Sequence, residues 1–407
     1  MSELNFLGKL LDGIEIKWLP IGDIAEIYGG LTGKTKADFE KGNAKYISYK
    51  TIFGSLNINN IPNDYVDVRE GERQNNVRYG DVLFTGSSEI AEEAGMSSAV
   101  TSQFDEPVYL NSFSFGVRFN DDIKIKPEFS KYLFRTSMMR TEIAKTASGV
   151  TRFNISKARF KKVLIPVPCP DDQEKSLSIQ SEIVRILDTF TALTAELTAE
   201  LTAELTMRKK QYNYYRDQLL SFKEGEVEWK TLGEVATFRR GTAITQKQTT
   251  PGDIPVVANG PTPTYFHSES NRQDETIVIA RSGAYAGYVS FWNQPIFLTD
   301  AFSVHPNLKI VKPKFLYYVL QNKQEHIHAM KKGAGVPHVR VKEFESYDVP
   351  IPPLAEQVRI VTILDKFDTL TNSITEGLPR EIELRQKQYE YYRDMLFSFP
   401  KPDVVEA

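Results

Sequence analysis

The stretch closest to a catalytic motif is YGGLTGKTK, at residues 28–36. A phosphate-binding loop needs the pattern Gly-x-x-x-x-Gly-Lys-Ser/Thr, because its backbone amides must cradle a phosphate. Counting back from Gly33 places Tyr28 where the first glycine belongs. The sequence therefore favours a flexible polar loop carrying Lys34 and Lys36 over a nucleotide site.

The sequence also gives little support for a metal site or for a covalent catalytic mechanism. His326 and His328 offer two ligands without a third cluster or a cysteine pair, so we interpret them as exposed helix histidines. The single cysteine, Cys169, rules out an intrachain disulfide and favours a reducing compartment such as the cytoplasm. We find no carboxylate pair, hydrolase turn or Asn-Pro-Pro-aromatic methylation motif. The sequence thus predicts no catalytic residue and no metal site.

Basic, aromatic and amide side chains gather near glycines in two loop-rich segments. Arginine suits bidentate contact with guanine and asparagine suits adenine, so these sets are candidates for DNA binding, although each residue alone is more often a solvated surface residue. The candidates are Lys34, Lys36, Tyr49, Lys50, Ser87, Arg152 and Asn154 in the first segment, and Arg239, Arg240, Lys247, Arg281, Ser282, Tyr285, His338 and Arg340 in the second.

The charge distribution agrees with this division. Residues 19–165 carry a net charge of +2 and residues 230–350 carry +4, which leaves −9 for the remainder of a chain whose total is −3. A small positive excess permits phosphate binding on one face of each segment. No signal peptide and no run of apolar residues long enough to span a membrane is evident.

The predicted strands and helices that would position these residues occur in two similar copies along the sequence. Residues 183–222 and 360–399 align without a gap, with 22 identities in 40 positions. The segments before them also repeat in order, including the β-branched runs Val82–Thr85 and Thr276–Ala280 and the helix starts at Pro127 and Pro313. The sequence predicts an α+β protein with two similar mixed α/β domains, each followed by a long helix.

The expected divisions of the chain follow from this repeat. They are a short N-terminal segment (1–17), a first domain (18–168), a central helix (169–222), a second domain (223–352), a C-terminal helix (353–400) and a tail (401–407).

The central helix contains Thr-Ala-Glu-Leu three times in succession. Residues four apart lie on one face of a helix, so the repeat predicts an apolar seam that drifts slowly around the axis. The seam residues are Leu193, Leu197, Leu201 and Leu205, with Ile374, Leu378 and Ile382 at the matching positions of the second helix. Pro379 is expected to kink or break that second helix near Gly377. The repeat is either low-complexity filler or a measured length.

This pattern resembles the DNA-specificity subunit of Type I restriction-modification systems over nearly the whole chain. The residues that carry the resemblance are IVRILDTF and IVTILDKF, YNYYRDQLLSF and YEYYRDMLFSF, and the turn IPIPPLAEQ at 349–357. The tandem Thr-Ala-Glu-Leu repeat resembles the Type IC subgroup. The resemblance implies two target-recognition domains, each reading one half of a split DNA sequence. It also implies that the two helices pair antiparallel under an internal pseudo-twofold.

The resemblance further implies a bacterial cytoplasmic chain without catalysis or a cofactor of its own. Two methyltransferase subunits would dock on it and use S-adenosylmethionine, and restriction subunits would join through them and use ATP and Mg²⁺. The conserved helix ends imply a docking role for Tyr212, Tyr215, Arg216, Tyr389, Tyr392 and Arg393. Two other interpretations remain open, a self-sufficient DNA-modifying enzyme and a coiled-coil adaptor without a DNA role.

Overall fold

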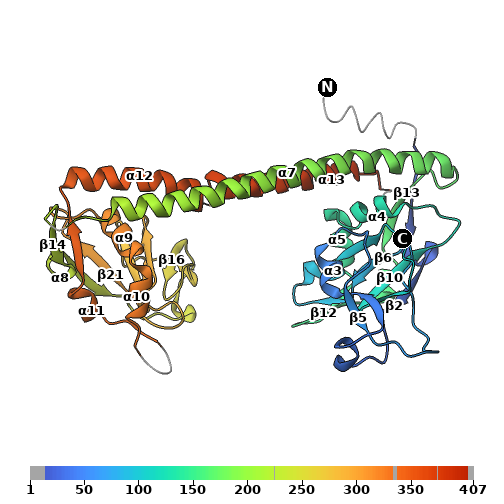
Figure 1. Ribbon diagram of the computed structural model, residues 1–407, viewed down its shortest axis with the longest axis horizontal. Coiled ribbons are helices and arrows are strands. Elements are labelled where there is room, and N and C mark those ends of the chain that lie inside the picture. Colours follow the sequence, from blue (N-terminus) through green and yellow to red (C-terminus); the bar gives the residue numbers. More distant parts are fainter. Residues whose placement is uncertain (1–13, 224, 333–336, 374, 402–407) are drawn as a thin grey trace. The chain divides into compact units, whose positions relative to one another are not determined.

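The computed structural model describes residues 14–223, 225–332, 337–373 and 375–401 (Figure 1). Contacts divide the chain into two compact units. The first contains the residues up to Ala199 together with those from Glu383 onward, and the second is Glu200–Ile382. Within the described ranges, no helix combines the length and apolarity needed to cross a membrane.

The first unit is built around a five-stranded sheet with the order β2-β10-β6-β8-β4, flanked by the smaller sheets β1-β13, β5-β3-β9 and β11-β12-β7. Its strands are β1 (Ile16–Pro20), β2 (Ala25–Gly29), β3 (Ala44–Ile47), β4 (Asn57–Ile58), β5 (Asp64–Val66), β6 (Val82–Thr85), β7 (Ser87–Ser88), β8 (Ser97–Val100), β9 (Val108–Leu110), β10 (Ser114–Phe119), β11 (Ala147–Ser148), β12 (Phe153–Ile155) and β13 (Leu164–Pro168). Its helices are α2 (Ile21–Ile24), η1 (Lys36–Phe39), α3 (Tyr49–Gly54), η2 (Ala91–Glu93), α4 (Pro127–Leu133), α5 (Ser137–Ala144), α6 (Lys157–Phe160) and the first part of α7 (Gln173–Leu219).

The second unit repeats this plan with a four-stranded sheet of order β15-β21-β18-β19 and the smaller sheets β14-β22 and β17-β16-β20. Its strands are β14 (Glu228–Thr231), β15 (Ala236–Arg240), β16 (Ile254–Val257), β17 (Tyr265–His267), β18 (Thr276–Ala280), β19 (Val289–Trp292), β20 (Phe297–Leu298), β21 (Ala301–Pro306) and β22 (Asp348–Ile351). Its helices are α8 (Leu232–Val235), η3 (Gln246–Gln248), α9 (Pro313–Asn322), α10 (Gln324–Ala329), α11 (Val341–Glu345) and α12 (Leu354–Asn372), and it includes the start of α13 (Gly377–Leu396).

The strand pairing confirms the predicted duplication. β2 and β6 flank β10 antiparallel in the first unit, as β15 and β18 flank β21 in the second. The parallel pair β3–β9 likewise has its counterpart in β16–β20. β6 and β18 coincide with the predicted β-branched runs, whose side chains are buried throughout. Pro127 and Pro313 start α4 and α9, as predicted, because a helix's first turn does not need their missing N–H.

The long helices attach to the two domains through the same hydrogen bonds. In the first unit, Tyr132 donates to Asp188 at 2.6 Å, and the Gln180 side chain accepts from the backbone N–H of Lys126 at 2.8 Å. In the second unit, Tyr318 donates to Asp365 at 2.6 Å, and the equivalent glutamine is Gln357, which bonds Lys312. Asp188 and Asp365 differ by the 177 positions that separate the sequence repeats. The repeat therefore encodes the helix–domain attachment as well as the helices.

Each unit also receives the end of the other long helix. In the first unit Phe190 of α7 stacks on Tyr392 of α13, with ring centroids 5.3 Å apart, and Thr191 donates to Tyr389 at 3.1 Å. In the second unit Tyr215 of α7 stacks on Phe367 of α12 at 5.6 Å. Phe190 contacts Tyr392, and the next residue, Thr191, contacts the earlier residue Tyr389. The two helices therefore run antiparallel there.

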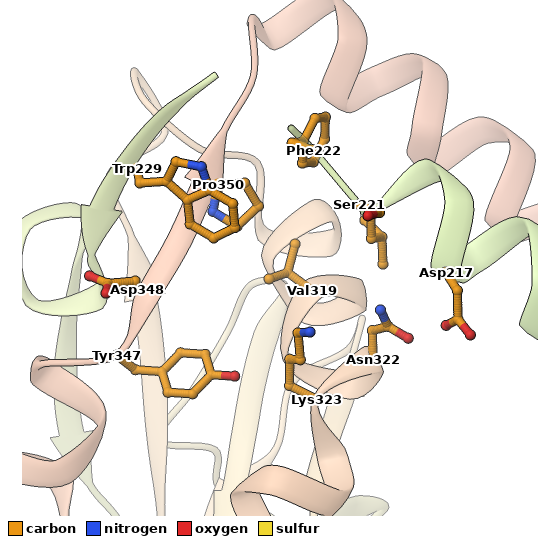
Figure 2. A pocket seen from close by; sticks show the side chains of 11 residues that line it. Asp217, Ser221, Phe222, Trp229, Val319, Asn322, Lys323, Tyr347, Asp348 and Pro350 are labelled. Carbon is orange, nitrogen blue, oxygen red and sulfur yellow. The ribbon is translucent and has the colours of Figure 1, made fainter. Parts of the chain in front are cut away.

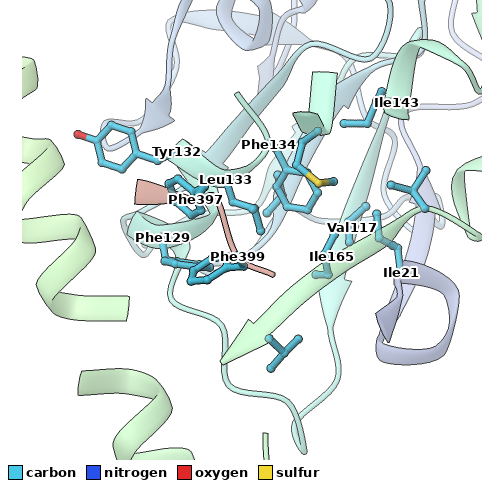
Figure 3. Packing of buried hydrophobic residues seen from close by; sticks show 14 of the residues in the cluster. Ile21, Val117, Phe129, Tyr132, Leu133, Phe134, Ile143, Ile165, Phe397 and Phe399 are labelled. Carbon is cyan, nitrogen blue, oxygen red and sulfur yellow. The ribbon is translucent and has the colours of Figure 1, made fainter. Parts of the chain in front are cut away.

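The C-terminal helix end completes the first unit's core. Phe397 and Phe399, just beyond α13, are buried among side chains of α4 (Figure 3). The rings of Phe129 and Phe397 lie 5.0 Å apart. The contact boundaries therefore fall inside the helices and differ from the sequence-based divisions at 168 and 222, which stay a prediction.

The C-terminal helix expected over 353–400 is interrupted and consists of α12 and α13. α12 ends at Asn372 and α13 begins at Gly377. Pro379 lies in the first turn of α13, where it is tolerated, and Gly377 has a φ of +77°. The predicted break is thus confirmed, and it falls just before Gly377.

The leucine seam is only partly covered. Leu197, Leu201 and Leu205 are half-buried, whereas Leu193 is 49% exposed. Leu378 and Ile382 are also half-buried, and Ile374 lies outside the described residues. Leu193 and Leu197 line a groove of about 620 Å³ between α7 and α13 in the first unit.

Candidate nucleic-acid interface

Four of the predicted DNA-binding residues meet in the first unit. Asn154 faces Ser87 in the β12–β7 register. Arg152 donates from Nε to the Ser87 hydroxyl at 3.1 Å, and Tyr49 donates to the Ser87 carbonyl at 2.8 Å. Ser87 is buried, whereas Arg152 and Asn154 are exposed. A buried serine thus positions an arginine and an asparagine at the end of β6, where both can reach a ligand.

The three lysines differ from this cluster. Lys34 forms an ion pair with Glu72 at 2.6 Å, and its side chain is only 4% exposed. Glu72 accepts hydrogen bonds from Lys34, from the Gln74 side chain and from the Arg69 backbone N–H, and these bonds lower the pKa of Glu72 to about 2. The Lys34 charge is therefore already neutralised within the unit. Lys36 and Lys50 are exposed, at the first residue of η1 and the second residue of α3.

A second cluster forms at the end of β18 in the second unit. Ser282 donates to Asp300 at 2.8 Å, and Asn259 donates to both the Asp300 carboxylate, at 2.5 Å, and the Ser282 hydroxyl, at 3.0 Å. The Arg281 guanidinium lies 3.7 Å from Asp300. His338 pairs with Ser282 through an isolated β-bridge. The predicted Arg281, Ser282 and His338 are therefore brought together.

The remaining predicted residues surround this cluster or lie apart from it. Arg240 ends β15 opposite Phe302, at the same sheet end as Arg281, and Arg239 precedes it. Tyr285 is exposed and packs edge-on against Tyr288 at 6.3 Å. Lys247 is exposed on η3, and Arg340 is exposed at the N-cap of α11. No contact joins Lys247 or Arg340 to Ser282 among the hydrogen bonds of the described residues.

Sequence reasoning missed three residues of these clusters, Phe113, Asn259 and Asp300. Phe113 is 63% exposed, and the Arg152 guanidinium lies 5.7 Å from its ring centroid. The sequence alone does not distinguish an exposed phenylalanine from one in the core, so composition gives no signal for Phe113. Asn259 lies in a loop without a recognisable pattern, and only its contacts connect it to Ser282.

The charged surroundings of β10 in the first unit differ from those of the equivalent strand β21 in the second. In the first unit Arg118 donates twice to the buried Asp81, which also accepts from Tyr28 at 2.7 Å. Burial, followed by the charge of Asp81, raises the pKa of Tyr28 well above its ordinary value. In the second unit burial, then Arg239 and Arg272, lowers the pKa of His305. The Arg118 charge is therefore paired within the first sheet, whereas in the second sheet Arg239 and Arg272 place positive charge close to His305.

The residues expected to dock other subunits are largely used within the chain. Tyr212 and Tyr389 are buried, and Arg216 donates to Asn322 at 2.8 Å. Arg393 forms an ion pair with Asp394 at 2.9 Å. The rings of Tyr215 and Tyr392 stack on Phe367 and Phe190. The docking role of these residues stays a prediction.

Two exposed rings stand beside the predicted docking residues. Tyr214 is 62% exposed and Tyr391 is 60% exposed, and the two are 177 positions apart. They therefore occupy equivalent places on the two repeated helix ends.

A concave site in the described part of the second unit lies apart from the candidate DNA-binding residues. A pocket of about 410 Å³ in the second unit lies among α7, α9 and β22, with Trp229, Tyr347 and Lys323 around it (Figure 2). None of the predicted DNA-binding residues lines it. Within the described residues, no group of three histidine, cysteine or acidic side chains is arranged to hold a metal. Cys169 is buried at a turn with a φ of +42°, and the His328 ring nitrogen contacts the Ala286 carbonyl at 3.0 Å.

Two copies of one framework, each with different polar side chains at the same end of its sheet, define a two-domain recognition protein. The family model described as the Type I restriction modification DNA specificity domain matches residues 15–207 and 224–384. The chain therefore belongs to the Type I restriction-modification DNA-specificity family.

Several curated relatives are specificity subunits of Type I restriction enzymes. The EcoR124I/EcoR124II specificity subunit of Escherichia coli is 40% identical over 429 aligned positions, which cover all of both chains. The EcoprrI specificity subunit of Escherichia coli is 36% identical and covers 92% of this chain and 93% of its own. A putative specificity subunit of Haemophilus influenzae is 34% identical and covers 97% of this chain and 98% of its own.

Solved structures share the fold at low sequence identity. A chain from a structure of the type I R-M system, described in terms of complex assembly and conformational transition, has a TM-score of 0.62 at 16% identity, covering 94% of this chain and 97% of that one. The HsdS subunit from Thermoanaerobacter tengcongensis has a TM-score of 0.50 at 17% identity, covering 94% and 95%.

Proposed function

We propose that this chain is the non-catalytic DNA-reading subunit of a Type I restriction-modification complex in the bacterial cytoplasm. Each unit reads one half of a split, asymmetric DNA sequence through the side chains at its sheet end. The chain brings two methyltransferase subunits to that DNA, and restriction subunits join through them. S-adenosylmethionine, ATP and Mg²⁺ are used by those partners, so this chain supplies only recognition and docking.

One observation carries the reading function. The two units share their strand pairing and helix attachments, yet they present different side chains at the same sheet end. In the strand register Tyr49 of the first unit corresponds to Asn259 of the second, and Asn154 corresponds to His338. Arg281 stands where the first unit has Gly86. A shared framework with different hydrogen-bonding groups is what reading two different base sequences requires, because each base pair presents its own donor and acceptor pattern in the major groove.

The repeated helix ends support docking of two identical partners. Tyr214 and Tyr391 are equivalent, exposed and next to the matched Tyr215 and Tyr392. Exposed aromatic rings are typical of protein interfaces. A chain that repeats one surface can present it to each of two copies of a partner.

The decisive experiment combines the purified full chain with its methyltransferase subunit. We expect methylation of adenine at N6 only within a two-part asymmetric sequence, mapped by sequencing treated genomic DNA. Methylation or binding without sequence preference would overturn the reading role. Tyr214→Ala with Tyr391→Ala is expected to weaken methyltransferase association while leaving the melting temperature unchanged, and an unchanged association would remove those rings from the interface.

The same preparation tests the two other functions. Methyl transfer by the chain without its partner would support a self-sufficient enzyme. Assembly with the methyltransferase but no DNA retention by the complex would support an adaptor without a DNA role.

A further inference from the structure

The residue directly before β10 in the first unit and the residue directly before β21 in the second occupy equivalent places. Ser114 starts β10 opposite Thr85, and Ala301 starts β21 opposite Ala280. The carbonyl of Ser114 accepts from Gly30 at 3.1 Å, and that of Ala301 accepts from Gly241 at 2.9 Å. Phe113 and Asp300 precede these two residues and therefore correspond.

Phe113 combines an exposed ring with a fixed backbone. Its N–H donates to the Asn111 side chain at 2.9 Å, and its carbonyl accepts from Gly86 at 2.8 Å. A β-carbon on Gly86 would lie 2.6 Å from that carbonyl oxygen, so only glycine allows this approach. The ring lies under the Arg152 guanidinium and belongs to no core cluster of the described residues. The first unit thus holds an apolar group at a defined place in solvent.

Asp300 puts the opposite chemistry at the same place. Its carboxylate accepts from Asn259 and Ser282, and its other oxygen faces Arg281. Two neutral donors fix the carboxylate, and the carboxylate then restrains a guanidinium whose side chain is 49% exposed. A planar guanidinium that is held from behind can present two parallel donors forward.

We propose that this position determines base specificity in both half-sites, by direct contact in the first unit and through Arg281 in the second. The proposal rests on the proposed DNA-reading function. Phe113 contacts the methyl group of a thymine, which is the apolar feature of the major groove. Asp300 is a positioning residue that orients Arg281 toward the O6 and N7 acceptors of a guanine.

The test uses the full chain with its methyltransferase and a set of duplexes in which each base pair of the recognised sequence is changed singly. Phe113→Ala is expected to lower discrimination about tenfold at one thymine-containing pair of the first half-site, and Phe113→Leu to retain most of it. Asp300→Asn preserves shape and most hydrogen bonds, and it is expected to lower discrimination about tenfold at one guanine-containing pair of the second half-site. Tyr79→Ala and Asp348→Asn, exposed changes outside the two clusters, are the matched controls.

A double variant shows whether Asp300 acts by positioning Arg281 or contributes to discrimination independently of it. If Asp300 acts through Arg281, the double variant Asp300→Asn, Arg281→Ala discriminates no worse than Arg281→Ala alone. Effects that multiply in the double variant would overturn the positioning role. Discrimination unchanged by Phe113→Ala, or weakened equally for every duplex, would overturn the direct contact. Failure of the proposed function is distinguishable, because the unaltered complex would then show no sequence preference.

Discussion

At the scale of single residues, the two units use arginine in different surroundings. Arg152 is bonded to a serine hydroxyl and lies over a phenylalanine ring, whereas Arg281 faces a carboxylate that is itself held by two donors. Arg152 is held by a directional hydrogen bond of 3.1 Å, whereas Arg281 is held by a looser ion-pair contact of 3.7 Å with Asp300. The two arginines are therefore expected to differ in how sharply they discriminate bases.

Replacing one arginine should affect only one half of the recognised sequence. Arg281→Ala should lose about 1–3 kcal/mol of discrimination at one base pair of the second half-site, as expected for a bidentate contact. Arg340→Ala belongs to the same unit and should likewise leave the first half-site intact. Arg152→Ala is the matched variant and should act only on the first half-site. Competition binding with singly substituted duplexes measures this, and equal relaxation of both half-sites would contradict reading by separate units.

His305 should make the second unit's stability depend on pH. Burial and the charges of Arg239 and Arg272 hold its pKa in the folded unit below the ordinary 6.5, so folding favours the neutral ring. The unfolded chain then binds more protons below that pH, and stability falls as the pH decreases through the ordinary pKa. His305→Gln should reduce the loss of melting temperature between about pH 7.5 and about pH 5.5. An identical loss in the variant would show that His305 is not responsible.

At the scale of elements, the Thr-Ala-Glu-Leu repeat lies within one uninterrupted helix of 47 residues, α7. Removing four residues shortens a helix by roughly 6 Å and turns its end by about 40°. A deletion of four residues also keeps the remaining leucines on nearly the same face of the helix. One base pair of DNA advances by about 3.4 Å and rotates by about 34–36°. The rotation matches one base pair, and the translation matches if the helix is inclined to the DNA axis.

Deleting Thr198–Leu201 should therefore keep both half-sites and shorten the unread spacer between them by one base pair. The sequence motif methylated by the variant complex measures this directly. A deletion of two residues is the control, because it moves the leucine seam to the opposite face and should impair assembly. If the four-residue deletion left the spacer unchanged, the repeat would be filler.

The segment directly after α13 is expected to stabilise the first unit. Phe397→Ala removes a fully buried ring that packs on Phe129, and such a change costs about 3–5 kcal/mol. Leu220→Ala is the equivalent change in the second unit and should act there instead. Proteolysis of each variant, read by the fragments released, distinguishes the units. Loss of the second unit on Phe397→Ala would contradict the assignment.

At the scale of the whole molecule, the proposed function assigns DNA reading to this chain and catalysis to its partners. The pure chain should neither methylate DNA, cut it nor hydrolyse ATP, because the sequence carries none of the motifs for these reactions. Assays with labelled S-adenosylmethionine and ATP check this. A sample freed of partner subunits that still transferred methyl groups would show that a catalytic site has been overlooked.

The duplication, and with it the fold, was predictable because identical letters recur at a constant spacing. The break before Gly377 followed from one proline, and the clustering of Arg152 with Asn154 followed from their nearness in sequence. The equivalence of Phe113 and Asp300 was not predictable. Aligning EPVYLNSFSF (106–115) with QPIFLTDAFS (294–303) without a gap sets Ser112 against Asp300, whereas the strand register contains one extra residue after Leu110. Hydrogen bonds between strands decide such a shift, and they leave no trace in composition.

Because Phe397 and Phe399 belong to the first unit's core, that unit is incomplete until the last part of the chain has been synthesised. Translation at about 5–20 residues per second separates Ala199 from those phenylalanines by about 10–40 seconds. During this interval the nascent first unit exposes the apolar surface of α4. A truncated product would never cover it, and it would be open to chaperones and proteases. We therefore expect the first unit to reach its native packing only after Phe397 and Phe399 have been added.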